Sequence, residues 1–174
     1  MSKKKTLTIT LIIFSFFNCG TTKQNPKNET MFIGQINLLD LKDEKHTEWF
    51  NKNYNTYRLK HNYLEELKKI PKDYTVSIYL GSWCNDSQRQ VPRFLKILDS
   101  INYNINNLKL FGLDKKKTSP NKVELGKIIN YVPTIIIYKK GKEINRIVET
   151  PIESLEQDLL KILKNNTYKH TYLD

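Results

Sequence analysis

The residues best suited to chemistry lie together in the segment Trp83-Cys84-Asn85-Asp86-Ser87. The run before it, residues 74–80, is rich in β-branched and aromatic side chains and predicts a strand, whereas residues 86–100 predict a helix. Cys84 is therefore expected at the N-terminal end of a helix, where unpaired backbone N–H groups and the helix dipole favour the thiolate. Because the thiolate is the nucleophilic form of cysteine, the first chemistry to consider is nucleophilic attack by this sulfur.

The neighbours of Cys84 leave alternatives open. Ser87 falls within the first helical turn, so its hydroxyl or N–H group is able to hydrogen-bond the sulfur, but a plain capping or surface role is equally consistent. Asp86 suits a helix N-terminus, while its negative charge opposes ionisation of the thiol. Trp83 is expected to shield the site. Alternatively, Cys84 is a small apolar residue that is simply buried, without a chemical role.

The pattern Trp83-Cys84-x-x-Ser87 resembles the Trp-Cys-x-x-Cys active site of the thioredoxin superfamily, with serine at the second cysteine position. Pro92 lies in the following helix, where thioredoxins often have a kink. Downstream, Val132-Pro133-Thr134 resembles the cis-proline loop, which in the family lies opposite the nucleophilic cysteine. The resemblance extends from about Thr47 to Leu163. It implies that Cys84 is catalytic, and that the supporting or substrate-groove residues are Trp83, Asp86, Ser87, Val132 and Pro133.

A single thiol limits the reactions that this resemblance implies. In dithiol relatives the second cysteine resolves the mixed disulfide with the client, and Ser87 is unable to do so. Cys84 is then expected to isomerise disulfides in protein or peptide clients, to reduce them with an external thiol donor, or to hold clients covalently. Reaction with peroxide is a weaker reading, because the Pro-x-x-x-Thr-x-x-Cys arrangement of the superfamily's peroxidases is missing.

The competing hypothesis is a non-catalytic binding module. In that case the same scaffold presents a groove around Trp83, Tyr131 and Pro133 to an extended peptide or a protein partner, without turnover. Fold alone does not decide between an enzyme and a binding module. The two hypotheses differ in one property, since only the enzyme requires a reactive and accessible Cys84 sulfur.

The elements around the site predict an α/β, thioredoxin-like fold: a central mixed β-sheet flanked by helices, with an N-terminal helical extension. Hydrophobic spacing predicts helices over residues 44–57, 62–70, 86–100 and 153–163, a helical turn over 123–129, and strands over 74–80, 108–113, 134–138 and 143–148. Parallel crossovers followed by a hairpin favour a mixed sheet with helices on both faces. The tail, residues 165–174, either adds an edge strand or packs on the domain.

The first residues predict export. Residues 1–18 combine a lysine-rich start with an apolar stretch and are interpreted as a signal peptide. The sequence Phe16-Phe17-Asn18-Cys19-Gly20 resembles the lipobox of bacterial lipoproteins, in which the cysteine is acylated. An ordinary signal peptide, or an uncleaved anchor with an incidental cysteine, is the alternative.

This interpretation divides the chain into three parts. Residues 19–30 are expected to be the lipidated cysteine and a polar, flexible tether, and residues 31–174 the thioredoxin-like domain. The expected location is the bacterial cell envelope, on a membrane through the lipid anchor, facing the periplasm or the exterior.

Composition and charge limit the partners, metal sites and disulfides that this chain is expected to have. The net charge is +11, but the basic residues are dispersed, with a tight run only at Lys115-Lys116-Lys117, and no nucleic-acid-binding motif accompanies them. Nucleic acid is therefore not an expected partner. The three histidines are His46, His61 and His170, without paired spacing, so neither a metal site nor a cofactor is expected. Cys19 and Cys84 are the two cysteines, and the domain must fold without an internal disulfide.

Overall fold

The computed structural model describes residues 31–42 and 44–172. The predicted signal peptide, Cys19 and the tether up to residue 30 lie outside the described residues. Within them, no helix combines the length and the apolar character that crossing a bilayer requires.

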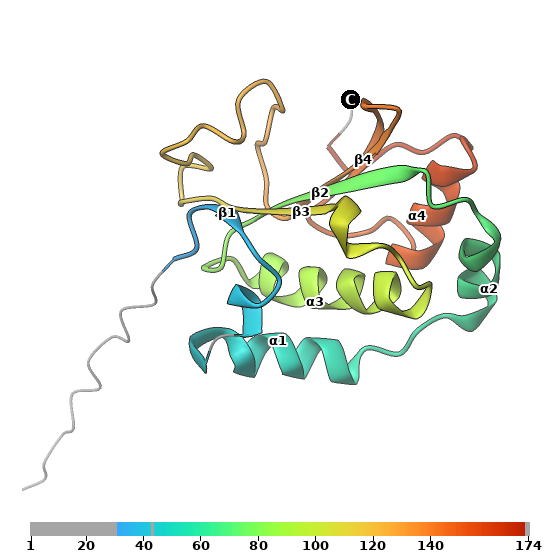
Figure 1. The fold of residues 1–174 in the computed structure, drawn as a ribbon, viewed down its shortest axis with the longest axis horizontal. Helices are drawn as coiled ribbons and strands as arrows, with labels where there is room; N and C mark the ends of the chain where they lie inside the picture. Colours follow the sequence, from blue (N-terminus) through green and yellow to red (C-terminus); the bar gives the residue numbers. More distant parts are fainter. Residues whose placement is uncertain (1–30, 43, 173–174) are drawn as a thin grey trace, which may run out of the picture.

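Five strands form one mixed sheet in the order β1-β3-β2-β4-β5 (Figure 1). The strands are β1 (Gly34–Ile36), β2 (Tyr74–Leu80), β3 (Leu108–Gly112), β4 (Thr134–Lys139) and β5 (Lys142–Val148). β2 pairs with β3 in parallel, and every other pairing is antiparallel. The predicted hairpin joins β4 to β5 through Lys140 and Gly141, both of which have positive φ, as the tightest hairpin turns require.

Four helices accompany the sheet: α1 (Glu44–Thr56), α2 (His61–Lys69), α3 (Asn85–Ser100) and α4 (Leu155–Leu163). Their ends agree with the predicted ones to within two residues. Two single turns of 3₁₀ helix span Asp40–Lys42 and Ile105–Asn107. The α/β class, the mixed sheet flanked by helices and the N-terminal helical extension (α1 and α2) are thus confirmed.

The described helices all pack on one face of the sheet. Their apolar residues share a single core with Val76, Ile78 and Leu80 of β2 and with Ile135 and Ile137 of β4. In Figure 1 the helices lie below the sheet, and a long irregular segment lies above it. This segment, residues 113–131, is called the cover loop below. The prediction of helices on both faces was therefore wrong for the described part of the chain.

The predicted helical turn at 123–129 is a series of separate turns within the cover loop. The N–H of Leu125 bonds the carbonyl of Lys122, at 3.0 Å, and the N–H of Lys127 bonds that of Glu124, at 2.9 Å. A helix does not propagate because Lys122, Gly126 and Ile128 have φ values of 50°, 75° and 53°, outside the right-handed helical region.

The cover loop is attached to the sheet through a second, smaller core. Its buried members are Tyr79, Leu113, Ile129, Val132 and Ile136. The hydroxyl of Tyr79 also donates to the carbonyl of Val123, at 3.4 Å. Tyr79 of β2 and Ile136 of β4 thus hold the cover loop by contacts with its backbone and with its apolar residues. The loop covers the face of the sheet on which a helix was predicted.

The C-terminal tail packs on the domain and forms no strand in its described residues. Tyr168 is buried, and its hydroxyl donates to the carboxylate of Asp158 in α4, at 3.0 Å. The side-chain amide of Asn145 in β5 donates to the Tyr168 carbonyl, also at 3.0 Å. These two bonds fix the direction in which the last residues run.

Candidate functional site

Cys84 lies where β2 gives way to α3, as the N-cap residue of that helix. Its carbonyl accepts the first helical hydrogen bond, from the N–H of Gln88 at 2.9 Å. The thiol is half-buried and donates to the carbonyl of Val132, with 3.2 Å between sulfur and oxygen. Val132 precedes Pro133 across a cis peptide bond. The structure thus brings together Cys84 and the Val-Pro pair that the sequence singles out.

Ser87 is completely buried, and its hydroxyl oxygen accepts a hydrogen bond from the N–H of Gly81, at 3.1 Å. The bond joins the end of β2 to the first turn of α3 and so fixes the position of the intervening Cys84. Since a buried N–H without a partner is costly, Ser87 has a structural role whatever Cys84 does.

Trp83 covers the turn before the helix. Its indole N–H donates to the carbonyl of Leu113 at the start of the cover loop, at 2.9 Å. The ring lies so close to Gly81 that a Cβ atom there would be 2.6 Å from the nearest ring carbon. Trp83 and Cys84 both pack against the smaller core. These contacts place Trp83 over Gly81 and the start of the cover loop, and that it shields the Cys84 thiol stays a prediction.

Replacing Gly81 with alanine is expected to displace this tryptophan. The new Cβ would lie 2.6–2.9 Å from three atoms of the rigid indole ring, so the ring must move and strain its bond to Leu113. We expect the free energy of unfolding, measured by urea unfolding, to fall by about 1–3 kcal/mol. We also expect the tryptophan fluorescence spectrum of the folded protein to shift. In a Trp83→Phe background the cost should shrink. An equal loss of stability in the Trp83→Phe background would contradict a clash between the new Cβ and the indole ring.

Asp86 forms an ion pair with Arg89, which lies one turn further along α3. The negative charge of Asp86, which is expected to oppose ionisation of the Cys84 thiol, is therefore paired with the positive charge of Arg89. Gln88 adds a further restraint, because its side-chain amide donates to the carbonyl of Ser82, at 2.7 Å. The start of α3 is held by several side-chain bonds to the preceding turn.

Two stacked tyrosines lie beside Val132: Tyr131, which the binding-module hypothesis includes in its groove, and Tyr172, which the sequence did not assign to the site. Tyr172 of the tail stacks on Tyr131, which precedes Val132, with 4.0 Å between ring centroids and 15° between planes. The Tyr172 hydroxyl donates to the Glu149 carboxylate. This bond is the main cause that raises the pKa of Tyr172 to about 12, and the charge of Asp86 contributes. The stack thus places Tyr172 of the tail against the residue that precedes Val132.

No group of three histidine, cysteine, aspartate or glutamate side chains in the described part of the chain is placed to hold a metal ion. Cys84 is a free cysteine. The structure places this free thiol beside a backbone carbonyl at the N-terminal end of a helix.

Comparison with known proteins identifies related sequences and folds. A family model described as thioredoxin matches residues 36–161. A crystal structure of a protein of unknown function from Pseudomonas aeruginosa superposes with a TM-score of 0.51 and 16% identity, over 68% of this chain and 81% of that one. At this identity the likeness concerns the fold alone. No curated protein matches the chain.

Proposed function

Because the chain belongs to the thioredoxin family, we propose that it is a single-thiol member that exchanges disulfides with protein or peptide clients through Cys84. The observation that carries this proposal is the position of the sulfur. It lies at the N-terminal end of α3, is half-buried, and faces the backbone beside the cis Val132–Pro133 bond. A sulfur in this position is placed to meet a client disulfide, and the adjacent backbone offers polar groups to a bound client.

The exchange conserves electrons at every step. The Cys84 thiolate attacks one sulfur of a client disulfide, a new disulfide joins the client to Cys84, and the other client sulfur leaves as a thiolate. Attack by a different client thiol then completes an isomerisation and returns Cys84 unchanged. If an external thiol attacks the Cys84 sulfur instead, the client leaves with both of its thiols reduced and the donor becomes joined to Cys84. A second donor thiol then frees Cys84, and the donor is released as a disulfide.

Ser87 supports the single-thiol form of this proposal. Its hydroxyl oxygen has no disulfide chemistry and already accepts the N–H bond from Gly81. Resolution of a mixed disulfide must therefore come from the client or from an external thiol donor. We place this activity in the bacterial cell envelope, on a membrane through a lipid on Cys19. That part of the proposal rests on residues 1–30 of the sequence.

A second candidate, the non-catalytic binding module, is favoured by one feature. A half-buried thiol that already donates to a backbone carbonyl is also compatible with a scaffold that merely packs its cysteine. In this case the backbone around Val132 and Pro133 would bind a peptide without covalent chemistry.

Covalent trapping separates the two candidates. The full-length chain with Cys19→Ser, which leaves Cys84 as the single thiol, would be mixed with a protein containing scrambled disulfides. We expect a covalent complex on non-reducing gels and recovery of the native disulfides. The additional change Cys84→Ser should abolish both. Absence of any complex, with Cys84 alkylated only after unfolding, would leave the binding module.

A further inference from the structure

The cover loop carries basic side chains whose charges are not neutralised within the domain. Its lysines are Lys115, Lys116, Lys117, Lys122 and Lys127. The first, second and fourth of these are exposed, and the other two are half-buried. No ion pair in the described part of the chain includes any of the five. Their ammonium groups therefore remain open to an anionic partner.

The two acidic residues of the loop are engaged in its own turns. The Asp114 carboxylate accepts bonds from the N–H groups of Lys116 and Thr118, both at 2.9 Å, and from the Thr118 hydroxyl, at 3.0 Å. The Glu124 carboxylate accepts the Ser119 hydroxyl, at 2.7 Å. These bonds fix the turns that carry the lysines. Because the lysines outnumber the acidic residues, the loop as a whole is a basic surface.

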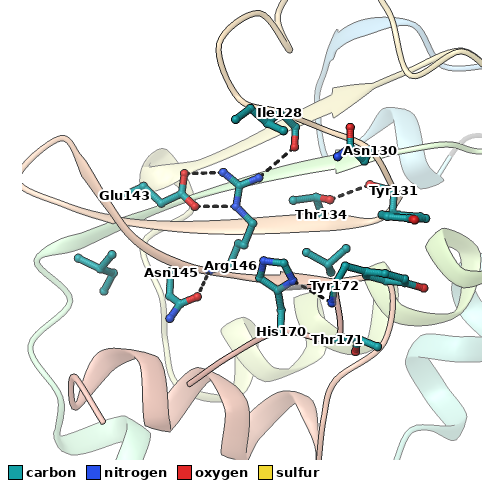
Figure 2. A pocket seen from close by; sticks show the side chains of 12 residues that line it. Ile128, Asn130, Tyr131, Thr134, Glu143, Asn145, Arg146, His170, Thr171 and Tyr172 are labelled. Carbon is teal, nitrogen blue, oxygen red and sulfur yellow. Dashed lines mark hydrogen bonds and ion pairs between the residues drawn. The ribbon is translucent and has the colours of Figure 1, made fainter. Parts of the chain in front are cut away.

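Two large apolar side chains lie on the same loop. Leu125 and Ile128 are 74% and 76% exposed, and both lie close in sequence to lysines. The guanidinium of Arg146 in β5 holds this part of the loop, because it donates to the carbonyls of Lys127 and Ile128 at 2.9 and 3.2 Å. Figure 2 shows the second of these bonds. Exposed apolar side chains flanked by lysines are typical of segments that lie at the headgroup level of an anionic bilayer.

The first described residues adjoin the start of the cover loop. Gly34 pairs with Gly112, which ends β3 directly before the loop, and a Cβ at Gly112 would lie 2.4 Å from the Phe32 carbonyl oxygen. In Figure 1 these residues and the loop meet at the same end of the sheet. The proposed lipid on Cys19 is twelve residues before Met31, and twelve residues span about 40 Å at most. Such a lipid would keep this end of the domain close to the bilayer.

We propose that the cover loop docks on the anionic surface of a lipid bilayer, with its lysines at the lipid phosphates and Leu125 at the level of the headgroups. This contact is additional to the proposed lipid anchor and independent of the reaction of Cys84. At the start of the loop, the Leu113 carbonyl accepts the indole N–H of Trp83. Just after its end, the Val132 carbonyl accepts the Cys84 thiol. A docked loop would therefore hold Cys84 near the membrane surface.

Acetylation of lysines in the presence of vesicles tests this docking. The full-length Cys19→Ser protein, which has no cysteine to acylate at position 19, would be mixed with vesicles of phosphatidylcholine, with or without phosphatidylglycerol. After brief acetylation, mass spectrometry measures the modification of each lysine. Lys140 and Lys142 are exposed and serve as the internal reference. They belong to the β4–β5 turn, which lies at the other end of β4 from the cover loop.

On the anionic vesicles we expect the loop lysines to react several-fold more slowly relative to Lys140 and Lys142. Neutral vesicles, or high salt with the anionic ones, should remove this protection. Each lysine near an anionic surface strengthens binding about fivefold. Lys115→Gln with Lys116→Gln should therefore raise the vesicle concentration that half-protects Lys122 about twentyfold. The matched pair, Lys140→Gln with Lys142→Gln, should leave it unchanged.

A second pair of variants tests the apolar contact. Leu125→Ser should raise the half-protecting concentration about tenfold, because partial burial of a leucine is lost. Leu39→Ser is its control, since Leu39 is 77% exposed and lies outside the loop. It should have no effect on the protection of Lys122.

The outcomes decide on the loop without involving the thiol. Equal protection of loop and reference lysines, equal protection by neutral and anionic vesicles, or no protection at all would overturn the docking surface. Protection that survives the loss of Lys115 and Lys116 would also overturn it. Because Cys84 is intact in every variant and the lipid is absent from all of them, none of these results bears on the proposed exchange or on the proposed anchor.

Discussion

A cysteine at position 87 should restore to this chain the resolving step that it lacks. In the full-length Cys19→Ser protein, Ser87→Cys leaves two thiols, one on the N-cap of α3 and one in its first turn. Residues three apart at a helix start are neighbours, within the separation of about 7 Å between Cα atoms that a disulfide tolerates. We expect mild oxidation to join Cys84 to the introduced thiol, with loss of two hydrogens visible by mass spectrometry.

The functional consequence is a change in the fate of the mixed disulfide. Reduced protein with Cys84 alone should remain covalently joined to a client until another thiol arrives, whereas the Ser87→Cys protein should release the client reduced and become oxidised itself. Single-turnover reactions analysed on non-reducing gels measure this difference. The variant should also lose about 1–2 kcal/mol of stability when reduced, because sulfur is a weaker acceptor for the buried Gly81 N–H.

Ser82 offers a matched control for this substitution. It is also a buried serine, and its hydroxyl oxygen accepts the N–H of Phe32, at 3.1 Å. Ser82→Cys therefore introduces a thiol at similar cost, but before Cys84 and outside the helix, and should not resolve the client. A folded Ser87→Cys protein whose new thiol fails to form a disulfide with Cys84 would show that the α3 terminus does not support exchange.

The elements predicted well are those encoded by local signals. The β-branched run of β2, the turn at Gly141 and the amphipathic pattern of α4 each occur within a few residues, and each element forms where expected. β1 was missed because three residues are too few to display alternation. It depends on pairing with a distant strand, Gly34 opposite Gly112, and a Cβ at Gly112 would collide with the Phe32 backbone.

The cover loop shows where hydrophobic spacing misleads. Val123, Leu125, Ile128 and Ile129 have the spacing of a helical turn, yet Leu125 and Ile128 are 74% and 76% exposed. Bonds from Tyr79 and Arg146 to loop carbonyls hold the alternative conformation. These contacts join residues far apart in the sequence, so the local pattern carries no trace of them.

At the candidate site, too, the sequence predicted one contact and missed another. The meeting of Cys84 with Val132 was expected because a family resemblance placed both residues. The stacking of Tyr172 on Tyr131 had no such guide. The alternating aromatic residues of the tail allowed either an edge strand or packing, and the choice was made by two tertiary bonds at Tyr168.

The side chain of Asp158 holds the C-terminal tail on the domain through its bond with Tyr168. Its side chain is fully buried and accepts bonds from the Tyr168 hydroxyl at 3.0 Å, and from the N–H groups of Ile152 and Glu153 at 2.7 and 3.3 Å. Asp158→Ala leaves three donors without this acceptor: the buried Tyr168 hydroxyl and the part-buried N–H groups of Ile152 and Glu153. We expect the free energy of unfolding to fall by about 3 kcal/mol or more, measured by urea unfolding.

The matched variant is Tyr168→Phe, which removes one of the three bonds and should cost about 1 kcal/mol. Both changes loosen the tail, so amide hydrogen exchange at residues 169–172 should become faster in each. If Asp158→Ala lowers stability while exchange in the tail stays slow, the carboxylate acts only on the turn before α4. Faster exchange in both variants would show that the Asp158–Tyr168 bond holds the tail, and with it Tyr172, against Tyr131.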